Sequence, residues 1–229
     1  MADIAVTIGV DIGQKVDPTA IAVVERQDRA GEDHHLVRHL ERLPLGTSYP
    51  DVVRRLAAVV ASVRARVERR TVTEPFFAER PFGAFDPDGH ERALLGVVSR
   101  EVEDRPRVAL YVDGTGVGQP VVDLLAAAGV TPTAVYFTHG DRRTEERGQI
   151  TLGKAWLVSH LQALLQTRRL HLPKTAEAEV LAKELLDYEI RADQDANDRY
   201  GAFKVGAHDD LVTALGLAIP PPPRRAVLL

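Results

Sequence analysis

The strongest constraint on the fold is a pattern that occurs twice, an apolar, β-branched run that ends directly in aspartate. Residues 4–10 run into Asp11, and residues 108–112 run into Asp113. A glycine-containing turn follows each aspartate. Such runs are typical of buried strands that end in a turn. We therefore expect Asp11 and Asp113 at the carboxyl ends of two strands inside a sheet.

The second run begins a β-α-β pattern, with a helix expected over residues 120–128 and a strand over 133–137. This order is typical of a parallel unit, whose ligand sites lie at the carboxyl ends of the strands. Upstream, residues 20–25 and 36–43 are expected to complete an antiparallel meander with the first strand. The pattern predicts an α/β fold with a central mixed sheet flanked by helices on both faces. The first strand should pair with the strand that ends at Asp113.

The remaining elements are expected within one domain over residues 1–219. Residues 71–105 are the least regular part and are interpreted as an insertion or lid. The expected helices are 52–70, 91–102, 152–166, 176–186 and 209–218, with an edge strand at 170–173 and a hairpin formed by 189–191 and 200–205. Four prolines then end the last helix, and residues 220–229 are expected to form a tail.

The composition is that of a globular protein and restricts the metal chemistry. Of the 229 residues, 45% are hydrophobic and 27% are charged. Because cysteine is absent, disulfides and thiolate metal sites are excluded. No run of about 18 apolar residues and no signal-like N-terminus is present, so we expect neither export nor a membrane span. The net charge of -4 counts against nucleic-acid binding, although a basic stretch holds Arg142, Arg143, Arg147, Lys154, Arg168 and Arg169.

Acidic residues at three places could form one metal centre. They are Asp11, Asp113 and the pair Asp209-Asp210, which opens the last expected helix. A single aspartate at a strand end can simply cap a turn. Together, however, these side chains would bring like charges into one pocket, which is costly unless a cation neutralises them. Oxygen ligands without cysteine favour Mg²⁺ or Mn²⁺, and two such ions can support phosphodiester hydrolysis.

Three segments carry a family resemblance. The runs at residues 8–13, 111–118 and 206–215 resemble, in order and spacing, the nuclease half of the large terminase subunit of tailed bacteriophages. The resemblance covers nearly the whole chain. It implies a ribonuclease-H-like fold and an endonuclease that cuts double-stranded DNA with two Mg²⁺ or Mn²⁺ ions during viral genome packaging.

By the same resemblance, Asp11, Asp113 and Asp210 are expected to be the catalytic metal ligands, with Asp209 as an auxiliary ligand or helix cap. The implied partners are double-stranded DNA, an ATPase domain or subunit, the small terminase and the portal protein, in the cytoplasm of a bacterial host. Lys15 and Lys204 are candidates for phosphate contacts, although solvated lysines are the simpler interpretation.

Two sequence features need a separate interpretation. His208 precedes the paired aspartates and either braces the turn or assists the metal site. Residues 148–155 come close to a phosphate-binding loop, but Ala155 replaces the required hydroxyl residue and a polar segment precedes the motif. We interpret this near match as a coincidence, so no complete ATPase motif is expected in this chain.

Three alternative functions stay open at this point. A Holliday-junction resolvase would share the fold and the metal chemistry but act on a branched substrate. The turns at Asp11 and Asp113 also resemble the phosphate-binding turns of actin-like or sugar-kinase-like ATPase domains. A DNA-binding or scaffolding module would keep the fold and use the carboxylates only for structure.

Overall fold

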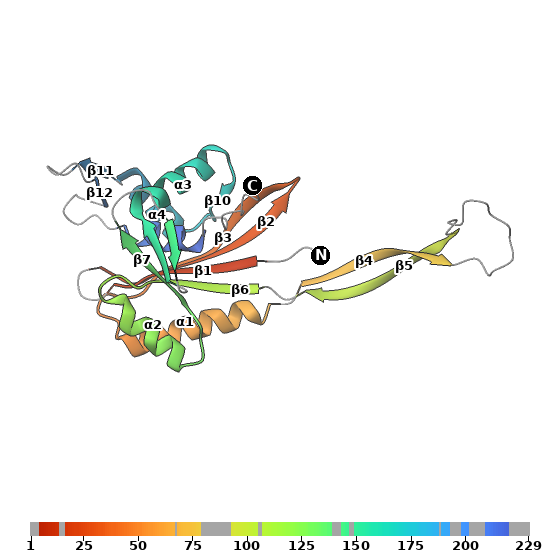
Figure 1. Cartoon of the computed structure of the whole chain (residues 1–229), viewed down its shortest axis with the longest axis horizontal. Helices are drawn as coiled ribbons and strands as arrows, with labels where there is room; N and C mark the ends of the chain where they lie inside the picture. The colour runs from red at the N-terminus through yellow and green to blue at the C-terminus, as the bar shows by residue number, and fades with distance from the viewer. Residues whose placement is uncertain are drawn as a thin grey trace.

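The computed structural model describes residues 5–13, 17–66, 68–78, 93–104, 107–138, 143–146, 149–187, 189–192, 198–201 and 209–219. Its centre is a mixed sheet of eight strands (Figure 1). These strands are β1 (Ala5–Asp11), β2 (Ala20–Arg29), β3 (Glu32–Arg42), β6 (Arg107–Asp113), β7 (Thr133–Thr138), β8 (Arg143–Glu146), β9 (Gln149–Gly153) and β10 (Leu170–His171). Their spatial order is β10-β3-β2-β1-β6-β7-β9-β8.

The pairing within the sheet confirms the predicted topology. Strands β1, β2 and β3 form an antiparallel meander, and β1 pairs in parallel with β6. Strands β6, β7 and β9 continue in parallel, while β8 closes that side in antiparallel orientation. The strand that ends at Asp11 and the strand that ends at Asp113 are therefore neighbours, as the β-α-β pattern predicted.

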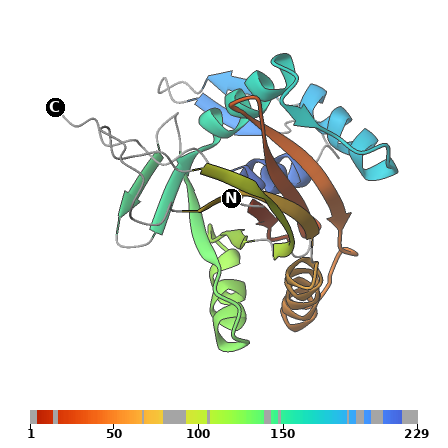
Figure 2. The same ribbon diagram turned by 90° about the vertical axis from the view of Figure 1, so that its right-hand side faces the viewer.

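Helices cover both faces of the sheet, which also confirms the prediction. One face carries α1 (Tyr49–Arg64) and α2 (Gly118–Ala127), and the other carries α3 (Lys154–Gln166), α4 (Ala176–Asp187) and α5 (Asp210–Ala218). Figure 2 shows α1 and α2 at the bottom of the view and α3 and α4 at the top. None of the helices in the described part of the chain is both long enough and apolar enough to cross a membrane.

The side chains of β1 alternate between these two layers, because successive residues of a strand point to opposite faces. Val6, Ile8 and Val10 are buried in the cluster that includes α1 and α2. Gly9 faces the opposite side, where a Cβ atom would lie 2.1 Å from the carbonyl oxygen of Ala214 in α5. The backbone of α5 therefore packs directly on β1, and only glycine leaves enough room for it.

Two helix predictions need correction. The helix expected at 91–102 is wrong, since the strand β5 (Ala93–Asp104) occupies this region and pairs with β4 (Glu68–Ala78). The helix expected to end near residue 70 ends at Arg64, because the chain then extends into β4. Strands β4 and β5 form a separate two-stranded sheet, which projects away from the eight-stranded sheet (Figure 1). The predicted insertion is thus a long hairpin in its described parts, and its role as a lid stays a prediction.

Strands β8 and β9 were not predicted from the sequence. Strand β9 runs directly into α3, with Gly153 as the extended residue before the helix. The resemblance to a phosphate-binding loop is therefore coincidental, because residues 149–153 form strand rather than loop. The predicted second hairpin is present as β11 (Glu189–Ala192) and β12 (Asp198–Gly201), while residues 202–205 lie outside the described part.

Candidate metal centre

Asp11 and Asp113 end neighbouring parallel strands at the same edge of the sheet. Val10 and Val112, the residues before them, are register partners in the β1–β6 pair. Both valines are buried on the face of α1 and α2. Because side chains alternate along a strand, Asp11 and Asp113 point to the opposite face, where α5 packs. The sequence prediction that places these two carboxylates together is consistent with this register.

A tight turn holds the Asp113 carboxylate in place. The backbone N–H of Thr115 donates to Asp113 Oδ1 at 2.8 Å, and the Thr115 hydroxyl accepts from the backbone N–H of Phe137 at 2.9 Å. A Cβ atom at Gly118 would lie 1.8 Å from the Asp113 carbonyl oxygen. Helix α2 therefore starts directly against the end of β6, and the turn links the carboxylate to the neighbouring strand β7.

Asp11 also lies in a row of residues across three strands. Ala20 is the register partner of Asp11 in β2, and Arg42 is the register partner of Ala20 in β3. Since neighbouring strands are about 4.8 Å apart, the backbones at Asp11 and Arg42 are separated by about 10 Å. The small, buried side chain of Ala20 lies between them and leaves room above the row for the start of α5.

Asp209 and Asp210 point to opposite sides of this row. Both oxygens of the buried Asp210 carboxylate accept hydrogen bonds from the Arg42 guanidinium, each at 2.7 Å. Asp209 Oδ2 instead lies 3.6 Å from the ammonium of Lys154, the first residue of α3. Arg42 is on the β3 side of Asp11, whereas α3 follows β9 on the Asp113 side. Asp209 is therefore the member of the pair whose partner lies on the Asp113 side of the sheet.

The cap of α5 comes from a residue that the sequence did not suggest. Asp209 occupies the N-cap position, but its side chain makes no capping hydrogen bond. Glu184 of α4 performs this function, since its Oε2 accepts from the backbone N–H groups of Leu211 and Val212 at 3.1 and 3.2 Å. The other oxygen of Glu184 accepts from Arg42. Because the cap comes from another helix, no local sequence signal could have revealed it.

The pKa values of Asp11 and Asp113 are both raised, as expected for neighbouring buried carboxyl groups. Burial raises the pKa of Asp11 well above its ordinary value, and the charge of Asp113 raises it further. Asp209 and, to a smaller extent, Asp210 act in the same direction, while the Lys154 ammonium opposes them. The negative charges are therefore only partly compensated in the protein without a cation.

Asp113 shows the same balance of effects. Burial is the largest contribution and raises the pKa of its carboxyl group. The hydrogen bonds from Thr115 and the charge of Lys154 lower it, and Asp209 raises it. The charge of Asp209 therefore contributes to the raised pKa of both strand-end carboxyl groups.

Comparison with known proteins bears on the fold of the chain. No protein-family model matches the sequence, and no curated protein gives a significant match. Among solved structures, the large terminase nuclease from thermophilic phage G20c aligns with a TM-score of 0.56 and 20% identity, over 94% of this chain and 81% of that one. The chain has the fold of a large terminase nuclease domain.

Other structures with the terminase nuclease fold give the same result. The nuclease domain from Thermus phage P74-26 has a TM-score of 0.51 and 18% identity, over 95% of this chain and 81% of that one. The P22 domain has a TM-score of 0.50 and 14% identity, over 96% of this chain and 81% of that one. The predicted ribonuclease-H-like α/β fold is thereby confirmed.

The structure describes some of the predicted site residues and not others. The charges of Asp113, Asp209 and Asp210 all raise the pKa of Asp11, while the Asp210 carboxylate is held by Arg42. Lys15, Lys204 and His208 lie outside the described residues. Within the described part of the chain, no three acidic or histidine side chains form a ready-made metal cluster. The assignment of Asp210 as a metal ligand stays a prediction, and the geometry favours Asp209 in that position.

Lys154 is a residue of the centre whose role the sequence analysis missed. It was grouped with a basic stretch and with the near match to a phosphate-binding loop. A signal was present, however, because the apolar residues Ile150 and Leu152 precede it at strand spacing. Lys154 follows β9, which runs parallel to β7 and β6, so it lies at the same edge of the sheet as Asp113.

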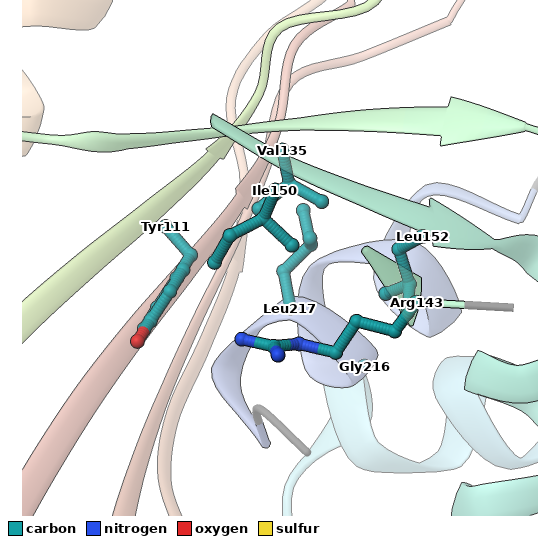
Figure 3. A pocket seen from close by; sticks show the side chains of 7 residues that line it. All are labelled: Tyr111, Val135, Arg143, Ile150, Leu152, Gly216 and Leu217. Atoms are coloured by element: carbon teal, nitrogen blue, oxygen red, sulfur yellow. The ribbon is translucent and has the colours of Figure 1, made fainter. Parts of the chain in front are cut away.

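A small cavity lies on the same face but under the later turns of α5. It is lined by Tyr111, Val135, Arg143, Ile150, Leu152, Gly216 and Leu217 (Figure 3). Among the described residues, no group accepts a hydrogen bond from Arg143 Nε, although its Nη2 binds Glu145 at 2.7 Å. The cavity is otherwise apolar and includes no carboxylate of the metal centre.

Proposed function

We propose that this chain is a divalent-metal-dependent endonuclease that cleaves double-stranded DNA during viral genome packaging. The observation that carries the proposal is the position of Asp11 and Asp113 on neighbouring strand ends, together with the charge of Asp209, which raises the pKa of both. Several neighbouring carboxylates favour a bound cation, because burial and mutual repulsion both disfavour their ionised forms when no cation is present. The fold of large terminase nuclease domains supports the same activity.

Two Mg²⁺ or Mn²⁺ ions are the proposed cofactors, with Asp11, Asp113 and Asp209 as the main ligands. Carboxylate oxygens are the ligands that these hard cations prefer. Structures of the G20c nuclease contain bound magnesium and bound cobalt. When bound, the ions would supply an activated water and stabilise the charge of the leaving oxygen.

The residues of this chain orient the carboxylates for that chemistry. Thr115 fixes the Asp113 carboxylate through its backbone N–H. Arg42 and Glu184 fix the start of α5 through Asp210 and the helix cap, so that Asp209 is directed to the Asp113 side. Pre-organised ligands reduce the conformational cost of binding, which is why we assign these neighbours a positioning role.

The proposed partners follow from the same fold. An ATPase domain or subunit, the small terminase and the portal protein would act with this nuclease in the cytoplasm of the bacterial host. Association with a separate ATPase component can be tested by co-purification, and it does not affect the assignment of the metal centre.

Plasmid digestion tests the proposed activity directly. The wild-type protein should cleave plasmid DNA with Mg²⁺ or Mn²⁺ and lose this activity in EDTA. Asp11→Asn and Asp113→Asn should abolish cleavage while leaving the protein folded. Asp123→Asn is a matched control, because Asp123 is an exposed carboxylate on α2. Cleavage in EDTA, or full activity of either strand-end variant, would reject the metal-ligand assignment.

Substrate choice separates the proposed function from its alternatives. A packaging nuclease should cut linear duplex DNA at least as well as a four-way junction of the same sequence. Strong preference for the junction would indicate a resolvase. ATP hydrolysis without DNA cleavage would indicate an actin-like ATPase domain, and binding of DNA without cleavage would indicate a scaffolding module.

A further inference from the structure

Lys154 lies beside the proposed metal ligands, but the proposed function gives it no role. Its ammonium lies 3.6 Å from Asp209 Oδ2 and 5.5 Å from the centre of the Phe137 ring. The side chains of Lys154 and Asp209 are 32% and 27% exposed, so both can be reached from solvent. The lysine therefore occupies an accessible position beside a proposed ligand.

The charge of Lys154 acts on the other two proposed ligands as well. Burial is the main reason why the pKa values of Asp11 and Asp113 are raised, and the ammonium partly offsets this effect at both carboxyl groups. One cation thus acts on the same three carboxylates that a divalent metal would use. An incoming metal ion and the ammonium must repel each other and compete for Asp209.

The contact between Lys154 and Asp209 is suited to exchange, in contrast to the neighbouring pair. Arg42 holds the buried Asp210 carboxylate through two hydrogen bonds of 2.7 Å. The Lys154 contact is a single, longer approach in a more exposed place. A lysine ammonium is a compact charge on a flexible stem, whereas a bidentate guanidinium pair is fixed in its geometry. The Lys154–Asp209 pair can therefore separate at small cost, whereas the Arg42–Asp210 pair cannot.

We propose that Lys154 is an exchangeable counter-ion of the carboxylate centre, which releases Asp209 to the metal ion and then binds a DNA phosphate. This inference rests on the proposed function. Once Asp209 binds a metal ion, the ammonium lacks its carboxylate partner but remains over the Phe137 ring, which favours a cation at that distance. The negative group that then enters the centre is the phosphodiester of the substrate, and lysine is a common phosphate ligand.

The proposal predicts opposite effects of Lys154→Met on two ligands. Mn²⁺ binding, measured by calorimetry without DNA, should become tighter by about tenfold, because a competing positive charge is removed. Binding of a short duplex in Ca²⁺, measured by fluorescence anisotropy, should become weaker by about tenfold, because a phosphate contact is lost. A merely structural lysine would not move the two affinities in opposite directions.

Two further variants complete the test. Lys183→Met removes an exposed lysine from α4 and changes the net charge by the same amount as Lys154→Met. It is the control for net charge, and its Mn²⁺ affinity should stay close to that of the wild type. Lys154→Arg keeps the positive charge and should stay near the wild type for Mn²⁺, and thermal melting shows whether each variant is folded. If Lys154→Met binds Mn²⁺ no more tightly than Lys183→Met, the proposal is overturned although the nuclease assignment stands. If the wild type itself binds no Mn²⁺ and cleaves no DNA, the proposed function fails and the inference fails with it.

Discussion

Asp209 and Asp210 are consecutive in the sequence but have opposite partners in the structure. Asp209 lies 3.6 Å from Lys154, and Asp210 is bound by Arg42 through two hydrogen bonds of 2.7 Å. Successive residues at a helix start are rotated by about 100°, so one carboxylate can face the centre while the other anchors the helix. This division assigns a different role to each residue and can be tested by exchanging each carboxylate for an amide.

Asp209→Asn should remove most Mn²⁺ binding and DNA cleavage with little loss of stability. Asp210→Asn should instead lower the free energy of unfolding by about 1–3 kcal/mol, because Arg42 loses a charged partner in a buried place. Calorimetry with Mn²⁺ and chemical denaturation without metal measure the two effects separately. If Asp210→Asn lost Mn²⁺ binding while Asp209→Asn retained it, the assignment based on the resemblance alone would be the correct one.

Glu184 should prove as important for stability as a residue inside the core. Glu184→Ala leaves the N–H groups of Leu211 and Val212 without their acceptor, which should cost about 1–3 kcal/mol. Glu184→Gln keeps an acceptor oxygen and should cost less. Glu179→Ala, at an exposed position of the same helix, is the control and should be nearly neutral. Equal stability of the Glu184 and Glu179 alanine variants would show that the cap contributes nothing.

The sequence was sufficient to predict the two central strands and their aspartates. Long β-branched runs that end at Asp11 and Asp113 are strong strand signals, and the β-α-β order determines which strands are parallel. The hairpin strand β5 was misread as a helix because it belongs to a two-stranded sheet separate from the main one, and its pairing with β4 joins residues far apart in the sequence. The short strands β8 and β9 were not predicted, because strands of four or five residues show little periodicity in the sequence.

The partners of the carboxylates could not have been predicted in the same way. Arg42 meets Asp210 because β3 lies two strands away from β1, with Ala20 between Asp11 and Arg42. Glu184 reaches the start of α5 from a separate helix. These contacts depend on register and helix packing in three dimensions, whereas sequence patterns mainly report on local structure.

Gly9 should tolerate no side chain. A Cβ atom would lie 2.1 Å from the Ala214 oxygen and 2.3 Å from the Ala218 nitrogen, and neither backbone atom can move without shifting α5. Gly9→Ala should therefore lower the free energy of unfolding by about 1–3 kcal/mol or more. It should also weaken Mn²⁺ binding, because α5 carries the Asp209 end of the centre. Gly31→Ala is the contrasting variant, since its Cβ meets no atom and only the positive φ of 85° opposes it.

His35 should control the stability of the protein in mild acid. Burial lowers its pKa to about 4, from 6.5, and the charge of His160 contributes in the same direction. The unfolded chain therefore takes up a proton at higher pH than the folded protein, so stability should fall as the pH drops from about 6.5 towards 4. His35→Gln should flatten this decline in a series of melting curves. Parallel curves for wild type and His35→Gln would contradict the expected titration.

Asp11 should make the metal-free protein less stable as the pH rises. Its folded pKa is raised well above the ordinary value of 3.8, mainly by burial and then by Asp113. A carboxyl group with a raised folded pKa costs stability once the pH exceeds its unfolded pKa, and the cost is complete above the folded pKa. At neutral pH without metal, Asp11→Asn should therefore melt roughly 2–4 °C higher than the wild type, the shift that about 1 kcal/mol produces in a domain of this size. Below about pH 3.8 the difference should vanish, because both side chains are then neutral.

Added Mn²⁺ should reverse the order of the two proteins. Metal ligands must be deprotonated, so the stabilisation of the wild type by Mn²⁺ should grow as the pH rises through the pKa of Asp11. Asp11→Asn lacks this carboxylate and should gain little from the metal at any pH. Asp123→Asn should follow the wild type in both conditions, because its site is an exposed position on α2. A wild-type protein that Mn²⁺ stabilises equally at all pH values would show that Asp11 does not titrate as a ligand of the centre.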